Sequence, residues 1–370
     1  MRASRLIPWV TAMTTLVSIA AAAVLVTAPS ATAIAATARR GSAPLPLHLR
    51  DTGLYEGEAG AVIRAQALPF TPQYTLWSDG ADKRRWILLP PGQAIDARRA
   101  DAWVFPIGTR LWKEFSHAGR PVETRYLERL VDGQWRFATY VWNQAGTDAV
   151  LAPEEGIPAM PVAQAPGGRY DVPSRSDCVV CHGGAAVPVL GFGALQLSPD
   201  RDPNAVHAMP VASHVDLRSL MARGLLRGLP APLLAEPPRI PAATPLERAA
   251  LGYLQANCAH CHNHDGQPVP VRLTLSHSVS SASASHARVL QSMVEAGSRY
   301  RPPGGPAEPQ VVVPGQPGLS VLALRMRSRH PQVQMPPIGT RIADPEGLAL
   351  IERWIASDLS QAPHSPEKQP

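Results

Sequence analysis

Hydrophobic residues follow a strand-like pattern between residues 70 and 170. Short apolar runs rich in aromatic and β-branched residues alternate there with Gly- and Pro-containing turns, which is typical of antiparallel strands. The runs are 85–89, 102–105, 111–115, 122–127 and 134–142. Asp132-Gly133 before the last run indicates a hairpin. We therefore expect an antiparallel β domain over residues 69–172, with its many tryptophans in the core.

The C-terminal third has apolar residues at helical spacing instead. Thr244-Pro245-Leu246-Glu247 has the form of a capping box, and an apolar stripe follows to Leu254. Asp344 precedes a second amphipathic segment that runs to Leu359. Ser213-His214-Val215-Asp216 predicts the start of a shorter helix. Gly252 would allow a close helix crossing.

Proline and polar residues mark the expected boundaries. The chain has 40 prolines, and residues 230–243 are rich enough in them to predict a linker. Residues 173–229 lie between the β domain and this linker, 244–359 form a helical domain, and 360–370 form a disordered tail. The fold class expected from this order is α+β, with an N-terminal antiparallel β domain and an all-α C-terminal domain.

The N-terminus has the pattern of a secretory signal peptide. Arg2 and Arg5 precede an apolar run over 6–28, and A-x-A cleavage sites follow, so residues 1–38 are expected to direct export. The run is about long enough to span a bilayer, so an uncleaved membrane anchor is the alternative. We expect a periplasmic protein.

Composition narrows the classes of partner. The net charge is +6 at pH 7 with no block of Lys or Arg, so nucleic acid is not an expected partner. No Ser/His/Asp triad, P-loop or dinucleotide fingerprint is present. An acidic redox protein would suit the mild basic excess.

Two C-x-x-C-H pentapeptides carry the candidate chemistry. Together they contain all four cysteines of the chain. The first motif has Cys178, Cys181 and His182, and the second has Cys258, Cys261 and His262. C-x-x-C-H is the attachment signature of c-type haem: the cysteines form thioethers and the histidine binds iron. The sequence therefore predicts two covalently attached haem c groups. Covalent attachment takes place outside the cytoplasmic membrane, in agreement with the expected export.

Two other uses of these cysteines remain open. Two C-x-x-C pairs can form a four-cysteine zinc site, although zinc ribbons separate their pairs by only about 15–20 residues. A disulfide within each pair is the other alternative. Neither explains why a histidine follows the second cysteine both times.

The C-terminal region resembles a class I cytochrome c domain. The resemblance rests on the helix that leads into Cys258-Ala259-His260-Cys261-His262, on Met335-Pro336-Pro337, and on a final helix with Arg353-Trp354-Ile355. In such domains the methionine before proline is the second axial ligand. The resemblance implies that His262 and Met335 ligate the second iron.

The whole chain is similar to an uncharacterised family of bacterial secreted dihaem cytochromes. These proteins place a Trp-containing β domain before one C-x-x-C-H and a cytochrome c domain after it. The matching stretches are 76–79, 105–109, 140–143, 257–262 and 313–317. The resemblance implies the domain order and no defined substrate.

The distal ligand of the first haem is open. His207, Met209 and His214 are the candidates, and without any of them the iron would have an open position. A β domain that ends in C-x-x-C-H also resembles cytochromes c′-beta, whose catalytic relatives link a strand lysine to the haem. Lys113 is the lysine expected on a strand.

Three functions follow from these expectations. The first is electron transfer to or from a periplasmic redox partner. The second is a haem enzyme in which an open first haem, fed by the second, carries out peroxidase-like or other small-molecule redox chemistry. The third is a binding module that uses the Trp-rich β domain.

Overall fold

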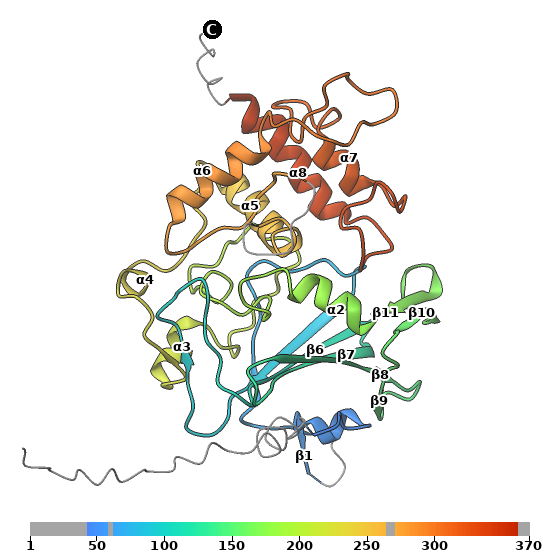
Figure 1. Cartoon of the computed structure of the whole chain (residues 1–370), viewed down its shortest axis with the longest axis vertical. Helices are drawn as coiled ribbons and strands as arrows, with labels where there is room; N and C mark the ends of the chain where they lie inside the picture. Colours follow the sequence, from blue (N-terminus) through green and yellow to red (C-terminus); the bar gives the residue numbers. More distant parts are fainter. Residues whose placement is uncertain (1–42, 58–61, 264–270, 362–370) are drawn as a thin grey trace, which may run out of the picture. The chain divides into compact units, whose positions relative to one another are not determined.

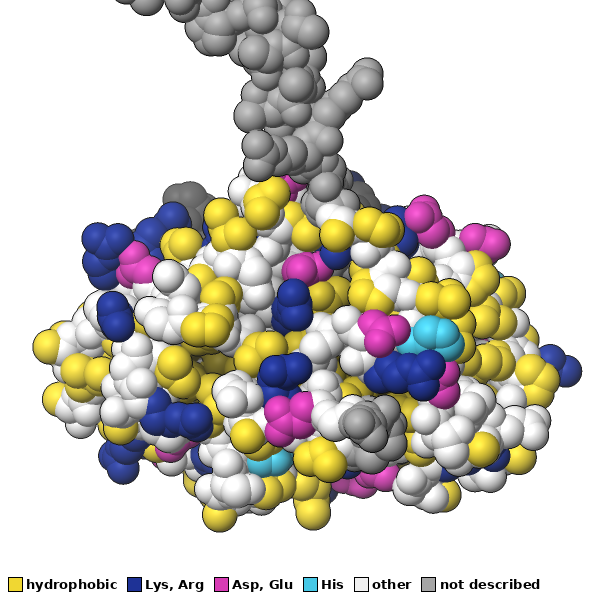
Figure 2. Space-filling model, turned by 90° about the horizontal axis from the view of Figure 1, so that it is seen from below, with side chains coloured by type: hydrophobic (Ala, Val, Ile, Leu, Met, Phe, Trp, Pro, Cys, Tyr) yellow, Lys and Arg dark blue, Asp and Glu magenta, His cyan; other side chains and the backbone are white. Residues whose placement is uncertain are grey.

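The computed structural model describes residues 43–57, 62–263 and 271–361 (Figure 1). The expected signal peptide over 1–38, and all but the first two residues of the expected tail, lie outside this range. In the described part, no helix is both long enough and apolar enough to cross a membrane. On the face drawn in Figure 2, basic and acidic side chains are interspersed rather than gathered by sign.

The main sheet has six strands in the order β3-β4-β6-β7-β8-β9, and every neighbouring pair is antiparallel. Its strands are β3 (Leu68–Pro69), β4 (Asp82–Leu88), β6 (Arg110–His117), β7 (Arg120–Arg129), β8 (Trp135–Trp142) and β9 (Ala149–Leu151). The expected hairpin joins β7 to β8, where Gly133 has φ +80°. The expected strand at 102–105 is wrong. Val104 forms only an isolated bridge with Asp96, and Pro106, which has no N–H, follows at once.

Three two-stranded sheets flank the main one. They pair β1 (Tyr55–Glu56) with β2 (Val62–Ile63), β10 (Ile157–Pro161) with β11 (Arg169–Val172), and β5 (Ile95–Asp96) with β12 (Leu226–Arg227). The last pair is parallel, so a strand after the first C-x-x-C-H joins one from the β region.

The two faces of the main sheet bury different cores. One face packs Trp86, Trp112 and Tyr126 against the N-terminal Leu49 and Leu54. On the other, the apolar residues of β4, β6, β7 and β8 pack beneath the segment around the first motif, namely Ile87, Leu111, Leu127 and Phe137 with Val189, Phe192 and Leu197. Of the tryptophans expected in this core, Trp86, Trp103 and Trp112 are buried. The others, Trp77, Trp135 and Trp142, are half-buried.

Seven α-helices complete the described fold, which is therefore mixed α+β. They are α2 (Arg175–His182), α3 (Leu217–Ala222), α4 (Pro232–Ala235), α5 (Pro245–Asn257), α6 (Ala282–Met293), α7 (Val321–Arg327) and α8 (Pro345–Ser357). Thr244 and Asp344 cap α5 and α8 as predicted. The cap of α3 is Asp216, paired with Ser219, because the Asp216 carboxylate accepts from the Ser219 N–H.

A loop from the β region crosses α5 at Gly252. A Cβ at Gly252 would lie 2.0 Å from Cε1 of Tyr74, so glycine is required there by a contact with Tyr74. The close crossing of α5 and α8 occurs instead at Gly347, where a Cβ would lie 2.3 Å from the Tyr253 ring. The expected role of Gly252 in a helix crossing is thus replaced by a contact with the β region.

Gly252→Ala is expected to destabilise the protein by about 1–2 kcal/mol in urea unfolding, because overpacking against Tyr74 exceeds the gain in helix propensity. Helix propensity alone would stabilise by up to about 1 kcal/mol, so the sign of the change identifies the contact. Gly318→Ala is the control, since a Cβ there meets nothing within 4 Å. A stabilised Gly252→Ala protein would contradict the contact.

Candidate functional site

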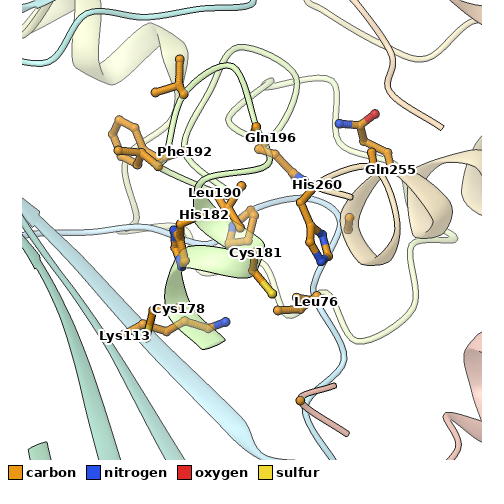
Figure 3. Close-up of a pocket in the computed structure, with 18 of the residues that line it drawn as sticks. Leu76, Lys113, Cys178, Cys181, His182, Leu190, Phe192, Gln196, Gln255 and His260 are labelled. Atoms are coloured by element: carbon orange, nitrogen blue, oxygen red, sulfur yellow. The ribbon is translucent and has the colours of Figure 1, made fainter. Parts of the chain in front are cut away.

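The first motif lies on a short, well-capped helix. In α2, the Ser174 hydroxyl accepts from the Asp177 N–H, and the Asp177 carboxylate accepts from the Ser174 N–H. Cys178, Cys181 and His182 share one helix face because they are three and four positions apart. All three line a cavity of about 1060 Å³ between α2, the main sheet and the loops after α2 (Figure 3).

The His182 ring is oriented by the backbone that follows it. Its Nδ1 donates to the carbonyl of Pro188 at 2.5 Å, and its ring lies 5.0 Å from that of Phe137. Burial lowers the pKa of His182 to about 4, so the imidazole is neutral. The Nδ1 hydrogen bond leaves the lone pair on Nε2, which is the arrangement of a metal-ligating histidine.

The second motif follows the end of α5. Cys258, Cys261 and His262 line their own cavity of about 400 Å³, and Met335 lies in its wall. The structure thus places His262 and Met335 in the lining of one cavity. Within the described ranges, the buried Nδ1 of His262 has no hydrogen-bond partner. Burial, followed by the nearby Arg325, lowers the pKa of His262, which favours the neutral ring.

Arginine side chains accompany Met335 in the second cavity. Arg272, Arg299, Arg325 and Arg329 line it. The Met335 N–H donates to the Arg325 carbonyl at 3.0 Å, so α7 positions the methionine. A haem carries two carboxylates on an apolar ring, and an apolar wall with several arginines suits that chemistry. The residues of this cavity fit a haem held by Cys258 and Cys261.

The two motifs are in direct contact. Asn263 Nδ2 donates to the carbonyl of Gly184 at 2.7 Å, and a Cβ at Gly184 would lie 2.4 Å from the carbonyl oxygen of His260. His260 lines both cavities. Figure 3 shows Cys181 between His182 and His260. Cys261 of the second motif is close enough to Cys181 of the first to raise its pKa, after the larger effect of burial.

The four thiols do not have the properties of a redox-active pair. All are free, and burial raises the pKa of each. The pKa of Cys181 rises to about 11 and that of Cys258 to about 12, through burial first and then through Cys261. Reactive C-x-x-C pairs have lowered pKa values instead. Among the described residues, no three His, Cys, Asp or Glu side chains are grouped to hold a metal ion by themselves.

The distal ligands suggested for the first haem lie elsewhere. His207 donates from Nε2 to Asp344, 2.9 Å away, because this carboxylate caps α8 beside it. Met209 is 79% exposed. His214 shares a 2.7 Å hydrogen bond with Thr71. None of the three lines the cavity of the first motif.

Other residues occupy that cavity, and sequence reasoning missed most of their roles. Lys113 does line it, and Figure 3 shows its amine on the side of Cys178 and Cys181. Arg85, Arg125 and His277 line it as well. Neither ring nitrogen of the buried His277 has a partner within the described ranges. The sequence Ser276-His277-Ser278 carries no motif, so nothing in it signalled this position.

The loop over 74–79 also links the β region to the second site. The Trp77 N–H donates to Asn257, the residue before Cys258, at 2.7 Å. The Asp79 carboxylate accepts from the backbone N–H groups of Arg341 and Ile342 at 2.9 and 3.1 Å. These contacts hold both the second motif and the segment that follows Met335.

Comparison with protein-family models, with curated proteins and with solved structures found no match to this chain. The interpretation of the site therefore rests on its own residues, namely two C-x-x-C-H motifs in contact, each at its own cavity.

Proposed function

We propose that this chain is a periplasmic dihaem c-type cytochrome that transfers electrons to or from a redox partner. One observation carries the proposal: the segments that carry the two C-x-x-C-H motifs touch where Asn263 bonds Gly184, while each motif lines its own cavity. Separate cavities suit two cofactors, and contact between the attachment segments suits transfer between them. A zinc site or two disulfides would need neither cavity.

In this proposal, side chains of the two motifs attach and orient the two haems. A haem at each motif supplies an iron that exchanges one electron at a time. Cys178 and Cys181 hold one group and Cys258 and Cys261 the other. The hydrogen bond from His182 Nδ1 to the Pro188 carbonyl orients the ring, so its Nε2 lone pair would be free to bind the iron.

The second site suits electron transfer best. His262 and Met335 line the same cavity, so both side chains would be available to hold a haem attached at Cys258 and Cys261. A thioether ligand favours the reduced iron and raises the potential. The resemblance to class I cytochromes c implies the same ligand pair. This site is the one we propose to exchange electrons with the partner.

The first site supports a second candidate function. Its cavity of about 1060 Å³ is larger than the second, of about 400 Å³, and His207, Met209 and His214 do not line it. A haem held there by Cys178, Cys181 and His182 would leave room in the cavity for a small molecule, and it would supply redox chemistry for it. Peroxidase-like chemistry is therefore the alternative to a pure carrier.

Secretion is part of the proposal. The Arg2, Arg5 and apolar pattern over 1–38 directs export, and the covalent attachment of haem requires it. The protein would then work in the periplasm, or at the membrane surface if the N-terminal segment is kept as an anchor. Its partner is a redox protein rather than nucleic acid.

The test is the optical spectrum of the reduced mature protein with and without carbon monoxide, produced in cells that attach haem c. We expect two covalent haems per chain. No shift with carbon monoxide supports the carrier, and a shift in about half of the signal supports an open first site. A protein without covalent haem contradicts both functions.

A further inference from the structure

The sheet face beneath α2 carries a row of cationic residues that the proposed function does not use. Strand register places Arg85 directly opposite Lys113, and Lys113 directly opposite Arg125, across β4, β6 and β7. All three line the first cavity. Directly opposite residues of antiparallel strands have Cβ atoms about 4.5–5.5 Å apart, so the three cationic side chains are neighbours.

Arg125 has its charge matched within the protein. Its Nε lies 2.7 Å from Oε1 of Glu123, a fully buried carboxylate. The Tyr170 hydroxyl donates to the same oxygen at 3.0 Å. The Arg125 guanidinium also lies over the Phe115 ring, 4.4 Å from its centre. This end of the row therefore carries an ion pair through Oε1, while Oε2 of Glu123 has no hydrogen-bond partner within the described ranges.

Arg85 and Lys113 have no such match. Arg85 is only 6% exposed, yet its guanidinium makes no hydrogen bond or ion pair within the described ranges. The Lys113 amine makes none there either; it lies over the Phe115 ring, 4.7 Å from its centre, and the charge of Glu123 acts on it only without a hydrogen bond. Burial, followed by the charge of Arg85, holds the pKa of Lys113 well below its ordinary value. Two adjacent basic groups thus face the cavity without a carboxylate between them.

Two adjacent, unpaired cationic side chains lower the stability of the fold unless an anion binds beside them in the cavity. Like charges directly opposite on a sheet are destabilising, and a buried unpaired charge costs more. Apolar residues at these positions would be less destabilising. The next row of the same face has such residues, namely Ile87, Leu111 and Leu127. An oxyanion would accept hydrogen bonds from the guanidinium fork and the amine together.

We propose that Arg85 and Lys113 form an oxyanion-binding site in the first cavity, for a carboxylate or a similar small oxyanion. The site rests on the proposed function only in that a haem at Cys178 and Cys181 would share the cavity. Its occupant has two possible sources, a free anion or a propionate of that haem. The Lys113 amine faces the attachment cysteines (Figure 3), and propionates lie at the opposite edge of a haem from its thioethers, which favours the free anion.

The test is a titration of the holoprotein with formate, in which calorimetry at constant ionic strength measures the binding. We expect saturable binding that weakens at least about tenfold in Arg85→Gln and in Lys113→Gln, because each removes a charge-assisted hydrogen bond. Arg85→Lys, which keeps the charge, should retain most of the affinity. Lys83→Gln is the matched control, since Lys83 lies on the same strand face but outside the cavity lining.

The midpoint potential of the first haem as a function of pH distinguishes the two sources. If the occupant is a propionate, formate does not bind, and a pH-dependent potential appears in Arg85→Gln and Lys113→Gln but not in Lys83→Gln. If both variants match Lys83→Gln in formate binding and in potential, the oxyanion site is wrong. A preparation without covalent haem contradicts the proposed function instead, and the formate titration still measures the site.

Discussion

Replacing Cys178 and Cys181 together by alanine is expected to leave one covalent haem per chain, and so is replacing Cys258 and Cys261 together. Each pair supplies both thioethers of one group at its own cavity, so the loss at one motif should not empty the other. Replacing all four cysteines should leave none. The measurement is the haem content of denatured protein, for which only covalent attachment survives.

Substitutions inside the motifs but outside the attachment chemistry provide the control. Val179→Ala and Ala259→Ser change the intervening positions and should keep both haems. Equal haem content in the double cysteine variants and in these controls would contradict thioether attachment. The loss of both haems on removal of one pair would show instead that the motif contact makes the two attachments interdependent.

Met335→Ala is expected to open the second site. Met335 shares the cavity of His262, and its loss would leave one axial position without a ligand from the chain. We expect the second haem then to bind carbon monoxide, and its midpoint potential to fall by the order of 0.1 V, within the roughly 0.8 V that axial ligands span. Potentiometry and the carbon monoxide spectrum measure the two effects.

Met326→Leu is the matched control for Met335. Met326 lines the same cavity, but it is a buried residue of α7 that packs in the helical core. Its replacement should change the stability more than the potential. A carbon monoxide shift in Met326→Leu but not in Met335→Ala would mean that Met326, and not Met335, is the ligand. Met335→His should restore a six-coordinate site with a lower potential.

Local chemistry was readable from the sequence wherever a few adjacent residues determine it. Thr244 and Asp344 start α5 and α8 as predicted, because a cap needs only a side chain and the N–H groups just beyond it. The hairpin at Gly133 follows from a similarly short signal. At 213–216 the prediction chose the wrong residue, because Asp216 and Ser219 form the better pair of reciprocal bonds.

The features of the site that the sequence did not predict depend on contacts between residues far apart in the chain. Arg85, Lys113 and Arg125 look like ordinary strand residues until the register aligns them on the cavity face. Lys83 is also a strand residue, since β4 starts earlier than the apolar run suggested. His207 was a plausible ligand by sequence spacing, but the carboxylate that caps α8 holds it. No local pattern encodes such competition.

The contacts of Tyr74, Trp77 and Asp79 have a consequence for how the protein matures. A fragment that begins at the linker would contain the second motif, Met335 and α8. It would lack Tyr74, which contacts Gly252, and the Trp77 N–H, which donates to Asn257. It would also lack the Asp79 carboxylate that accepts from the backbone of 341–342. The supposed C-terminal module is therefore incomplete without a loop made more than 150 residues earlier. We therefore expect the haem proposed at the second motif to be bound only once the β region has folded against it, so that the two halves mature together.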